Sequence, residues 1–278
     1  MNLPDLPLAI EAALLAQDDT WDDSVIHATD LAVYFTGDDG KCPRELWLRL
    51  HGAKQRGLHR GELLMFDHGN EIHERTTKLL NAGFEALGEQ WEVYRVEHPV
   101  EYEGVTGRYD VMLRNSFNEL VIVDYKTSRG RAFQYMDSPR PSNELQLQFY
   151  LLAADADAGL ILYIDREGQN YMRAYRVDRD DLRVEEAIEC AGMIAGLPEP
   201  PEILKPRIKV NENKGLNSIN VSQPWQCDWC RFCDIACPGA LPPDYRVKGI
   251  VGHIDEGRFL PKAGMEHMVE VLPFEEGA

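Results

Sequence analysis

The chain has 278 residues, 44% of them hydrophobic, and is therefore long enough to bury a substantial core. No stretch is both long and apolar enough to cross a lipid bilayer, which argues against a membrane-spanning protein. The net charge of −18 opposes binding to polyanions such as nucleic acids unless the basic residues gather on one surface.

The first 65 residues are predicted to form a helical segment with an uneven charge distribution. Residues 1–40 hold nine acidic side chains and no Lys or Arg. The basic block that follows contains Lys41, Arg44, Arg49, Lys54, Arg56 and Arg60. This block is either part of a basic channel or the solvated face of a helix. Two later groups would extend a channel: Lys126, Arg129 and Arg131, and then Lys205, Arg207, Lys209 and Lys214.

A helix is expected over residues 67–82, and strands are expected over 91–96, 105–113 and 120–126. The helix carries His73. A histidine at this point could bind a metal ion, although a lone histidine on a helix is more often structural or exposed to solvent.

The third of these strands ends in residues that suggest chemistry. Its apolar run is β-branched and unbroken up to Asp124, which is typical of a strand buried on both faces. Asp124 and Lys126 share one face, because side chains two apart in a strand point the same way. With Asp110 on the preceding strand, two carboxylates would repel unless a cation lay between them, and oxygen ligands suit Mg²⁺ or Mn²⁺. The alternative is a solvated Asp-Lys pair, since this spacing also occurs by chance.

A helix is predicted over residues 142–155, with Ser142 as its N-cap. Gln146 and Tyr150 are four residues apart and therefore neighbours on one helix face, where both could touch a substrate. Strands over 160–165 and 171–177 and a helix over 179–196 complete the expected α/β core. Prolines end the last helix, and loop or extended chain is expected beyond it.

Four cysteines lie within eleven residues near the C-terminus: Cys227, Cys230, Cys233 and Cys237. Thiolates this close together favour a soft metal, either a tetrahedral zinc or an iron-sulfur cluster. The N-terminus has neither a basic region nor a cleavable apolar segment, so we expect a cytoplasmic protein with reduced thiols. A zinc ribbon needs a second Cys pair, and Cys42 is the natural distant partner. Cys190 is expected to be a small core residue.

The order of these motifs resembles the RecB-type branch of the PD-(D/E)XK nuclease superfamily over about residues 66–150. The resemblance rests on a helix histidine, G-x-x-D, D-x-K and Q-x-x-x-Y. It implies a mixed sheet flanked by helices, as in restriction endonucleases. It also implies His73, Asp110, Asp124 and the Tyr125 carbonyl as metal ligands, Lys126 as catalytic lysine, and Gln146 with Tyr150 as an active-site helix motif. The chain departs from the superfamily pattern because no proline precedes Asp110.

The cysteine layout is similar to that of iron-sulfur exonucleases, namely the CRISPR-associated RecB-like family and the AddB nuclease domain. One cysteine precedes the nuclease core and three follow it in those proteins. The resemblance implies a 4Fe-4S cluster held by Cys42, Cys227, Cys230 and Cys237, with a structural role. The usual spacing of the C-terminal trio differs here, so a set with Cys233 in place of Cys237 stays open.

The sequence thus predicts a metal-dependent DNA exonuclease with Mg²⁺ or Mn²⁺, acting on single-stranded DNA or free ends. The expected organisation is an N-terminal segment (1–65), a nuclease core (66–196) and a cluster lobe with a tail (197–278). CRISPR adaptation, recombination, repair or phage DNA metabolism are the expected settings, with protein partners in such complexes. The alternatives are a non-cleaving DNA-end-binding or assembly factor and a restriction-type endonuclease, which the same core could support.

Overall fold

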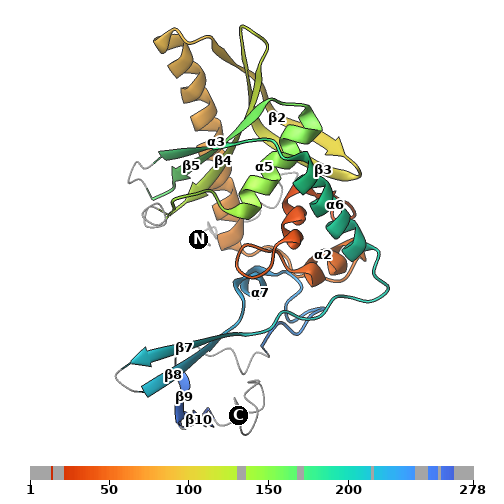
Figure 1. The fold of residues 1–278 in the computed structure, drawn as a ribbon, viewed down its shortest axis with the longest axis vertical. Helices are drawn as coiled ribbons and strands as arrows, with labels where there is room; N and C mark the ends of the chain where they lie inside the picture. The colour runs from red at the N-terminus through yellow and green to blue at the C-terminus, as the bar shows by residue number, and fades with distance from the viewer. Residues whose placement is uncertain are drawn as a thin grey trace, which may run out of the picture. The chain divides into compact units, whose positions relative to one another are not determined.

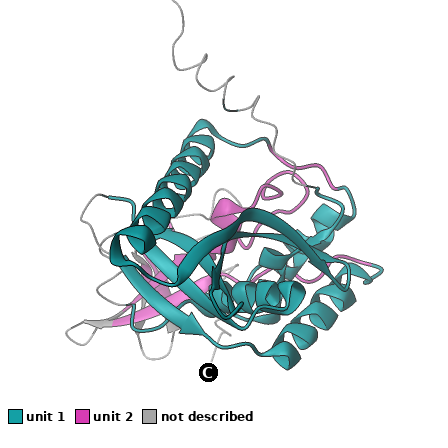
Figure 2. Ribbon diagram, turned by 90° about the horizontal axis from the view of Figure 1, so that it is seen from above, with its two compact units in different colours: residues 1–52, 57–198 teal, residues 53–56, 199–278 magenta. Residues whose placement is uncertain are grey.

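The structure of the chain is a computed structural model that describes residues 14, 22–129, 136–167, 172–213, 216–241, 250–255 and 258–265 (Figure 1). The chain forms two compact units (Figure 2). We call residues 1–52 and 57–198 the core unit, and residues 53–56 and 199–278 the C-terminal unit. Each unit is described separately below.

The core unit is built on a six-stranded mixed sheet. Its strands are β1 (Ile26–His27), β2 (Trp91–Tyr102), β3 (Val105–Asn115), β4 (Leu120–Ser128), β5 (Ala158–Asp165) and β6 (Met172–Val177). The order is β1-β3-β4-β5-β6, and β2 also pairs with β3. The pairs β1/β3 and β4/β5 are parallel and the others are antiparallel. The predicted α/β fold with a mixed sheet is therefore confirmed.

Helices cover both faces of this sheet (Figure 1). They are η1 (Ala28–Tyr34, a 3₁₀ helix), α2 (Pro43–Leu50), α3 (Arg60–Leu87), α5 (Pro141–Ala154) and α6 (Asp181–Ala195). Alternation along β4 explains the two layers, because Ile122 packs into the core under α5 and α6, whereas Val123 and Tyr125 pack with Leu80 and Phe84 of α3. Strand β4 is thus buried on both faces, as its apolar run predicts.

Three predicted elements have clearly wrong boundaries. The helix expected over residues 67–82 is α3, which begins at Arg60 and ends at Leu87. Strand β2 continues to Tyr102 instead of stopping at residue 96, because a tight turn at Glu103 and Gly104, both with positive φ, joins it to β3. Helix α5 begins at Pro141 with Arg140 as N-cap, so Ser142 is inside the helix. Proline fits the first helical position, since its φ is already helical and it needs no amide donor there.

The C-terminal unit contains a sheet where loop or extended chain was expected. Its strands β7 (Arg207–Asn213), β8 (Leu216–Ser222), β9 (Ile250–Asp255) and β10 (Arg258–Pro261) form an antiparallel sheet in the order β10-β9-β8-β7. Alternation explains the strands, because Ile219 and Val221 of β8 are both buried. A short helix, α7 (Trp225–Trp229), follows β8.

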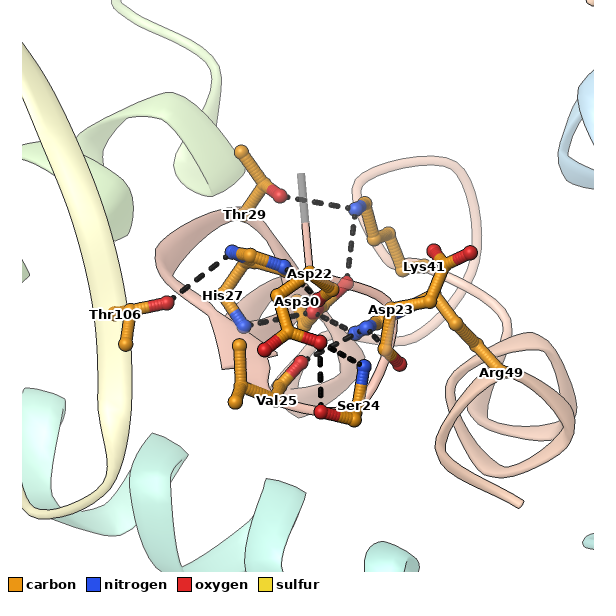
Figure 3. Close-up of polar contacts among 10 residues, drawn as sticks. All are labelled: Asp22, Asp23, Ser24, Val25, His27, Thr29, Asp30, Lys41, Arg49 and Thr106. Carbon is orange, nitrogen blue, oxygen red and sulfur yellow. Dashed lines mark hydrogen bonds and ion pairs between the residues drawn. The ribbon is translucent and has the colours of Figure 1, made fainter. Parts of the chain in front are cut away.

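The basic block is partly used for internal structure (Figure 3). The carboxylate of Asp30, which is buried, pairs with Arg49 and lies 3.2 Å from Lys41 Nζ. Arg49 also donates to the carbonyls of Asp23 and Val25 at 2.9 and 2.8 Å. Arg49 therefore belongs to the packing between η1 and α2, and the channel interpretation does not apply to it.

The carboxylate of Asp30 also accepts the backbone N–H of His27 at 2.9 Å, which fixes the start of η1. The two later basic groups are described only in part, because Arg131 and Lys214 lie outside the described residues. Across the described part of the chain, no helix combines the length and apolar character needed to cross a membrane.

Candidate active site

Strand β4 carries the predicted Asp-x-Lys pair in its second half. The Asp124 side chain is 3% exposed, and the Lys126 ammonium lies 2.8 Å from its Oδ2 atom. The Lys126 ammonium is therefore the charge partner of this buried carboxylate oxygen. Burying a carboxylate in this way is costly unless another positive charge is nearby. The interpretation as a solvated pair is therefore wrong.

Asp110, on β3, connects this pair to helix α3. Its Oδ2 atom accepts the backbone N–H of Tyr125 at 2.5 Å, and its Oδ1 atom lies 3.3 Å from Nδ1 of His73. The Tyr125 side chain is buried on the α3 side, where its ring meets the His73 ring edge-on at 5.4 Å. One carboxylate thus bridges β4 and α3, and the lone helix histidine faces the two aspartates.

Helix α5 adds a hydrogen-bonded chain to Lys126. The ammonium donates to Oε1 of Gln146 at 2.9 Å, and Nε2 of Gln146 donates to the Tyr150 hydroxyl at 2.8 Å. The i,i+4 spacing predicted from the sequence is therefore a direct contact. Gly107 of β3 lets Tyr150 approach, since a Cβ there would lie 2.6 Å from the tyrosine ring.

Burial and charge shift the titration of these groups. Desolvation, together with repulsion by Asp110, raises the pKa of Asp124 from 3.8 to about 6, although Lys126 opposes the shift. Burial lowers the pKa of Lys126, but Asp124 and Asp110 outweigh it, so the net pKa is raised. The pKa of His73 is likewise raised, because the Asp110 hydrogen bond and the nearby carboxylates outweigh burial. The ion-free site therefore carries excess negative charge that favours a cation.

Sequence reasoning missed one residue of the site, Glu97 of β2. One oxygen or nitrogen atom from each of His73, Glu97 and Asp110 lies within 4.8 Å of the other two, which is compatible with a metal ion. The turn at Glu103 and Gly104 gives the signal that could have found it. A two-residue hairpin turn pairs Tyr102 with Val105, and counting back from that pair puts Glu97 opposite Asp110.

The structure brings the seven predicted active-site residues together: His73, Asp110, Asp124, Tyr125, Lys126, Gln146 and Tyr150. It also supplies an observation that fits a divalent ion, namely the ligand atoms of His73, Glu97 and Asp110, which lie within 4.8 Å of one another. Carboxylate ligands suit both Mn²⁺ and Mg²⁺.

The predicted cluster ligands come from both units. Cys42 is the buried N-cap residue of α2 in the core unit. Cys227 and Cys230 are buried, and Cys237 half-buried, in the C-terminal unit. Residues 227–237 fold into a compact loop, in which the Phe232 carbonyl accepts hydrogen bonds from the backbone amides of residues 235, 236 and 237 at 3.0 to 3.1 Å. Cys190 packs against the core of the first unit, as expected.

The sequence matches the PD-(D/E)XK nuclease superfamily over residues 35–237, and the chain belongs to this superfamily. Among solved structures, SSO0001 is similar, with 19% identity, a TM-score of 0.50, and coverage of 85% of this chain and 95% of that one. An alkaline exonuclease from Laribacter hongkongensis is 15% identical, with a TM-score of 0.44 and coverage of 62% and 86%. A phage-related exonuclease from Haemophilus somnus is also 15% identical, with a TM-score of 0.43 and coverage of 62% and 93%. No curated protein matches the sequence.

Proposed function

We propose that the protein is a metal-dependent DNA exonuclease acting on single-stranded DNA or free ends. The observation that supports this most strongly is the complete constellation of Asp110 on β3 with Asp124 and Lys126 on β4, in a chain that belongs to a nuclease superfamily. The preference for ends is inferred from the resemblance of His73 and the Gln146-Tyr150 helix motif to the RecB-type branch. The settings named above, including CRISPR adaptation and repair, are inferred from that resemblance alone.

In this proposal His73, Asp110, Asp124 and the Tyr125 carbonyl would hold Mg²⁺ or Mn²⁺. Such an ion, when bound, supplies a Lewis acid at the scissile phosphate and lowers the pKa of a water molecule. Lys126 stays protonated beside the two aspartates and donates hydrogen bonds toward the charge that develops on the phosphate. Gln146 accepts from the ammonium and holds it in place, and Tyr150 holds Gln146.

Cleavage of end-labelled DNA tests this proposal. Linear single strands, linear duplex and closed circular single strands would be incubated with Mg²⁺ or Mn²⁺. Wild type should shorten linear DNA stepwise and leave circles intact, and Asp124→Asn should abolish this. The matched control is Asp178→Asn, which removes an exposed carboxylate that pairs with Arg176 and should behave as wild type.

Other outcomes of the same assay identify the alternatives. Cleavage of closed circles would favour an endonuclease of restriction type. Binding of DNA ends without cleavage under either metal would favour the delivery or assembly factor. That reading is the weaker one, because no carboxylate or lysine of the constellation is missing.

We further propose that Cys42, Cys227, Cys230 and Cys237 hold a 4Fe-4S cluster with a structural role, Cys233 being the alternative to Cys237. The support for this proposal is the sequence spacing, which puts four cysteines within eleven residues. A cluster joining distant segments would stabilise the fold by its binding free energy.

Anaerobically purified protein should then be brown and contain iron and sulfide in equal amounts. Cys227→Ser should lose the colour and melt at a lower temperature, whereas Cys190→Ser should keep the colour. A colourless protein that contains one zinc ion per chain would contradict the iron-sulfur proposal and indicate a zinc site instead.

A further inference from the structure

Glu97 is placed toward the candidate site by the pairing of β2 with β3. The pairs Val96–Val111 and His98–Tyr109 flank it, so Glu97 lies opposite Asp110. Directly opposed residues of an antiparallel pair have their Cβ atoms about 5 Å apart, and two carboxylates there repel each other. Burial and the charge of Asp110 accordingly raise the pKa of Glu97.

The three side chains from β2, β3 and α3 offer a suitable ligand geometry. Their nearest ligand atoms lie within 4.8 Å of one another, and His73 Nδ1 and Asp110 Oδ1 are already 3.3 Å apart. Ligand atoms around a six-coordinate Mg²⁺ or Mn²⁺, each about 2.1 Å from the ion, are roughly 3 to 4 Å apart. Small side-chain rotations therefore suffice to bring all three onto one ion.

A second observation points to a cation at this place. Asp124 is 2% exposed, and Asp110 accepts the backbone N–H of Tyr125, the residue that follows Asp124, so a further, buried carboxylate belongs to the same part of the sheet. The group of His73, Glu97 and Asp110 therefore has a further carboxylate, Asp124, beside it, and Asp124 is paired with Lys126. The ligand supply exceeds what Asp110 and Asp124 provide alone.

We infer that Glu97 is a ligand of the divalent ion and joins His73 and Asp110, whose ligand atoms lie nearest to it, in the ligand set that also contains Asp124 and the Tyr125 carbonyl. This inference rests on the proposed function and deepens it, because it adds a carboxylate from β2 to the metal site. The alternative is that the Glu97 carboxylate only forms an ion pair with Arg108, whose Nε lies 2.9 Å from Oε2 of Glu97. Both side chains are about half exposed, and such a pair contributes only ~0 to 1 kcal/mol to stability.

The backbone at Glu97 allows a test that separates binding from folding. Its φ of +46° lies in the left-handed region, which asparagine tolerates better than glutamate. Glu97→Asn removes the carboxylate and should leave the ion-free protein at least as stable as wild type. A weaker metal affinity in this variant could therefore not be ascribed to misfolding.

The experiment is a titration of DNA-free protein with Mn²⁺, followed by electron paramagnetic resonance of the unbound ion. Glu97→Gln and Glu97→Asn should each weaken Mn²⁺ binding by about tenfold or more, in the range that lost metal-site groups usually cost. Arg108→Gln should leave the affinity unchanged or tighten it, because it removes a positive charge from beside the site. Glu92→Gln is the matched control, since Glu92 on the same strand also pairs with an arginine of β3.

Two results would overturn the inference. One is an unchanged Mn²⁺ affinity in both Glu97 variants. The other is an equal loss in Arg108→Gln, which would assign Glu97 to the ion pair alone. Failure of the proposed nuclease gives a different pattern: wild type that binds Mn²⁺ through Glu97 but cuts no DNA would reject the nuclease and leave the ligand set standing.

Discussion

Lys126 donates a hydrogen bond to Gln146 at 2.9 Å, and this contact joins the end of β4 to helix α5. The lysine is therefore held from two sides, by the Asp124 carboxylate and by an amide that is itself fixed by Tyr150. Side chains held in this way need little reorganisation when charge develops on a substrate.

Substitutions of the hydrogen-bonded side chains Lys126, Gln146 and Tyr150 should lower the activity to different degrees. Lys126→Met should lower kcat by about 100-fold or more, because a donor to the developing charge is lost. Gln146→Ala should lower kcat by about tenfold with little change in KM, since it frees the lysine without removing it. Tyr150→Phe should have the smallest effect and cost about 1 kcal/mol of stability. Steady-state kinetics on labelled DNA measures all three, and an effect of Gln146→Ala on KM alone would contradict the positioning role.

Asp124 should make the stability of the ion-free protein depend on pH. Its pKa is raised to about 6 in the folded state, so the folded protein keeps this proton between pH 3.8 and 6 while the unfolded chain loses it. Stability should thus be greatest at low pH and fall as pH rises through this window, by at most about 1.4 kcal/mol per pH unit. This decrease in the free energy of unfolding is measured relative to Asp124→Asn, because asparagine has no carboxyl group to titrate. Urea unfolding of both proteins at pH 4 and pH 7 checks this.

A difference between wild type and Asp124→Asn that stays constant with pH would show that burial does not shift this carboxyl. Adding Mn²⁺ at pH 7 should raise the stability of wild type more than that of the variant, because a bound cation relieves the buried negative charge.

The Asp30 carboxylate should matter for folding and not for metal binding. Asp30→Asn leaves the guanidinium of Arg49, which is 9% exposed, without its ion pair, and should cost about 3 to 5 kcal/mol. Lys41→Met should cost about 1 kcal/mol or less, because the Lys41 side chain is 38% exposed. Urea unfolding with Mn²⁺ titration of the folded fraction measures both effects. Equal losses of unfolding free energy in the two variants would show that the buried Asp30–Arg49 pair stabilises the fold no more than the exposed contact with Lys41.

Gly107 should be intolerant of a side chain. The Cβ of Gly107→Ala would lie 2.6 Å from the Tyr150 ring and 3.1 Å from Ala28, so the ring must move. We expect a loss of about 1 to 3 kcal/mol and a lower kcat, because Tyr150 supports Gln146. Gly83→Ala is the control: Gly83 lies in helix α3 with no atom near its Cβ position, and the change should stabilise the protein by up to ~1 kcal/mol. Unaltered activity in Gly107→Ala would contradict the view that this glycine is needed to position Tyr150.

Local patterns predicted much of the core unit. The apolar run before Asp124 predicted a doubly buried strand, and the four-residue spacing of Gln146 and Tyr150 predicted a shared helix face. Both follow from side-chain periods of 2 and 3.6 residues, which depend only on the local backbone. The boundaries of β2 and α5 were wrong because the turn at Glu103 and the proline at position 141 decide them.

The charge pattern predicted less, because pairing partners are distant in sequence. Arg49 looked like part of a basic surface, and only the folded chain shows that it pairs with Asp30, nineteen residues earlier. Sequence position alone does not indicate which of several basic residues will meet a buried carboxylate.

By itself, the sequence determined which residues have the chemistry of the site: the carboxylates Asp110 and Asp124, the ammonium of Lys126, and the amide and hydroxyl of the α5 motif. The pairing of His73 with Asp110 was expected only from the resemblance, and the tertiary structure alone decided that Glu97 joins them, since these three side chains come from two paired strands and a helix. Their proximity depends on strand register and on helix packing across a sheet face, and both are set by burial of apolar surface over the whole core.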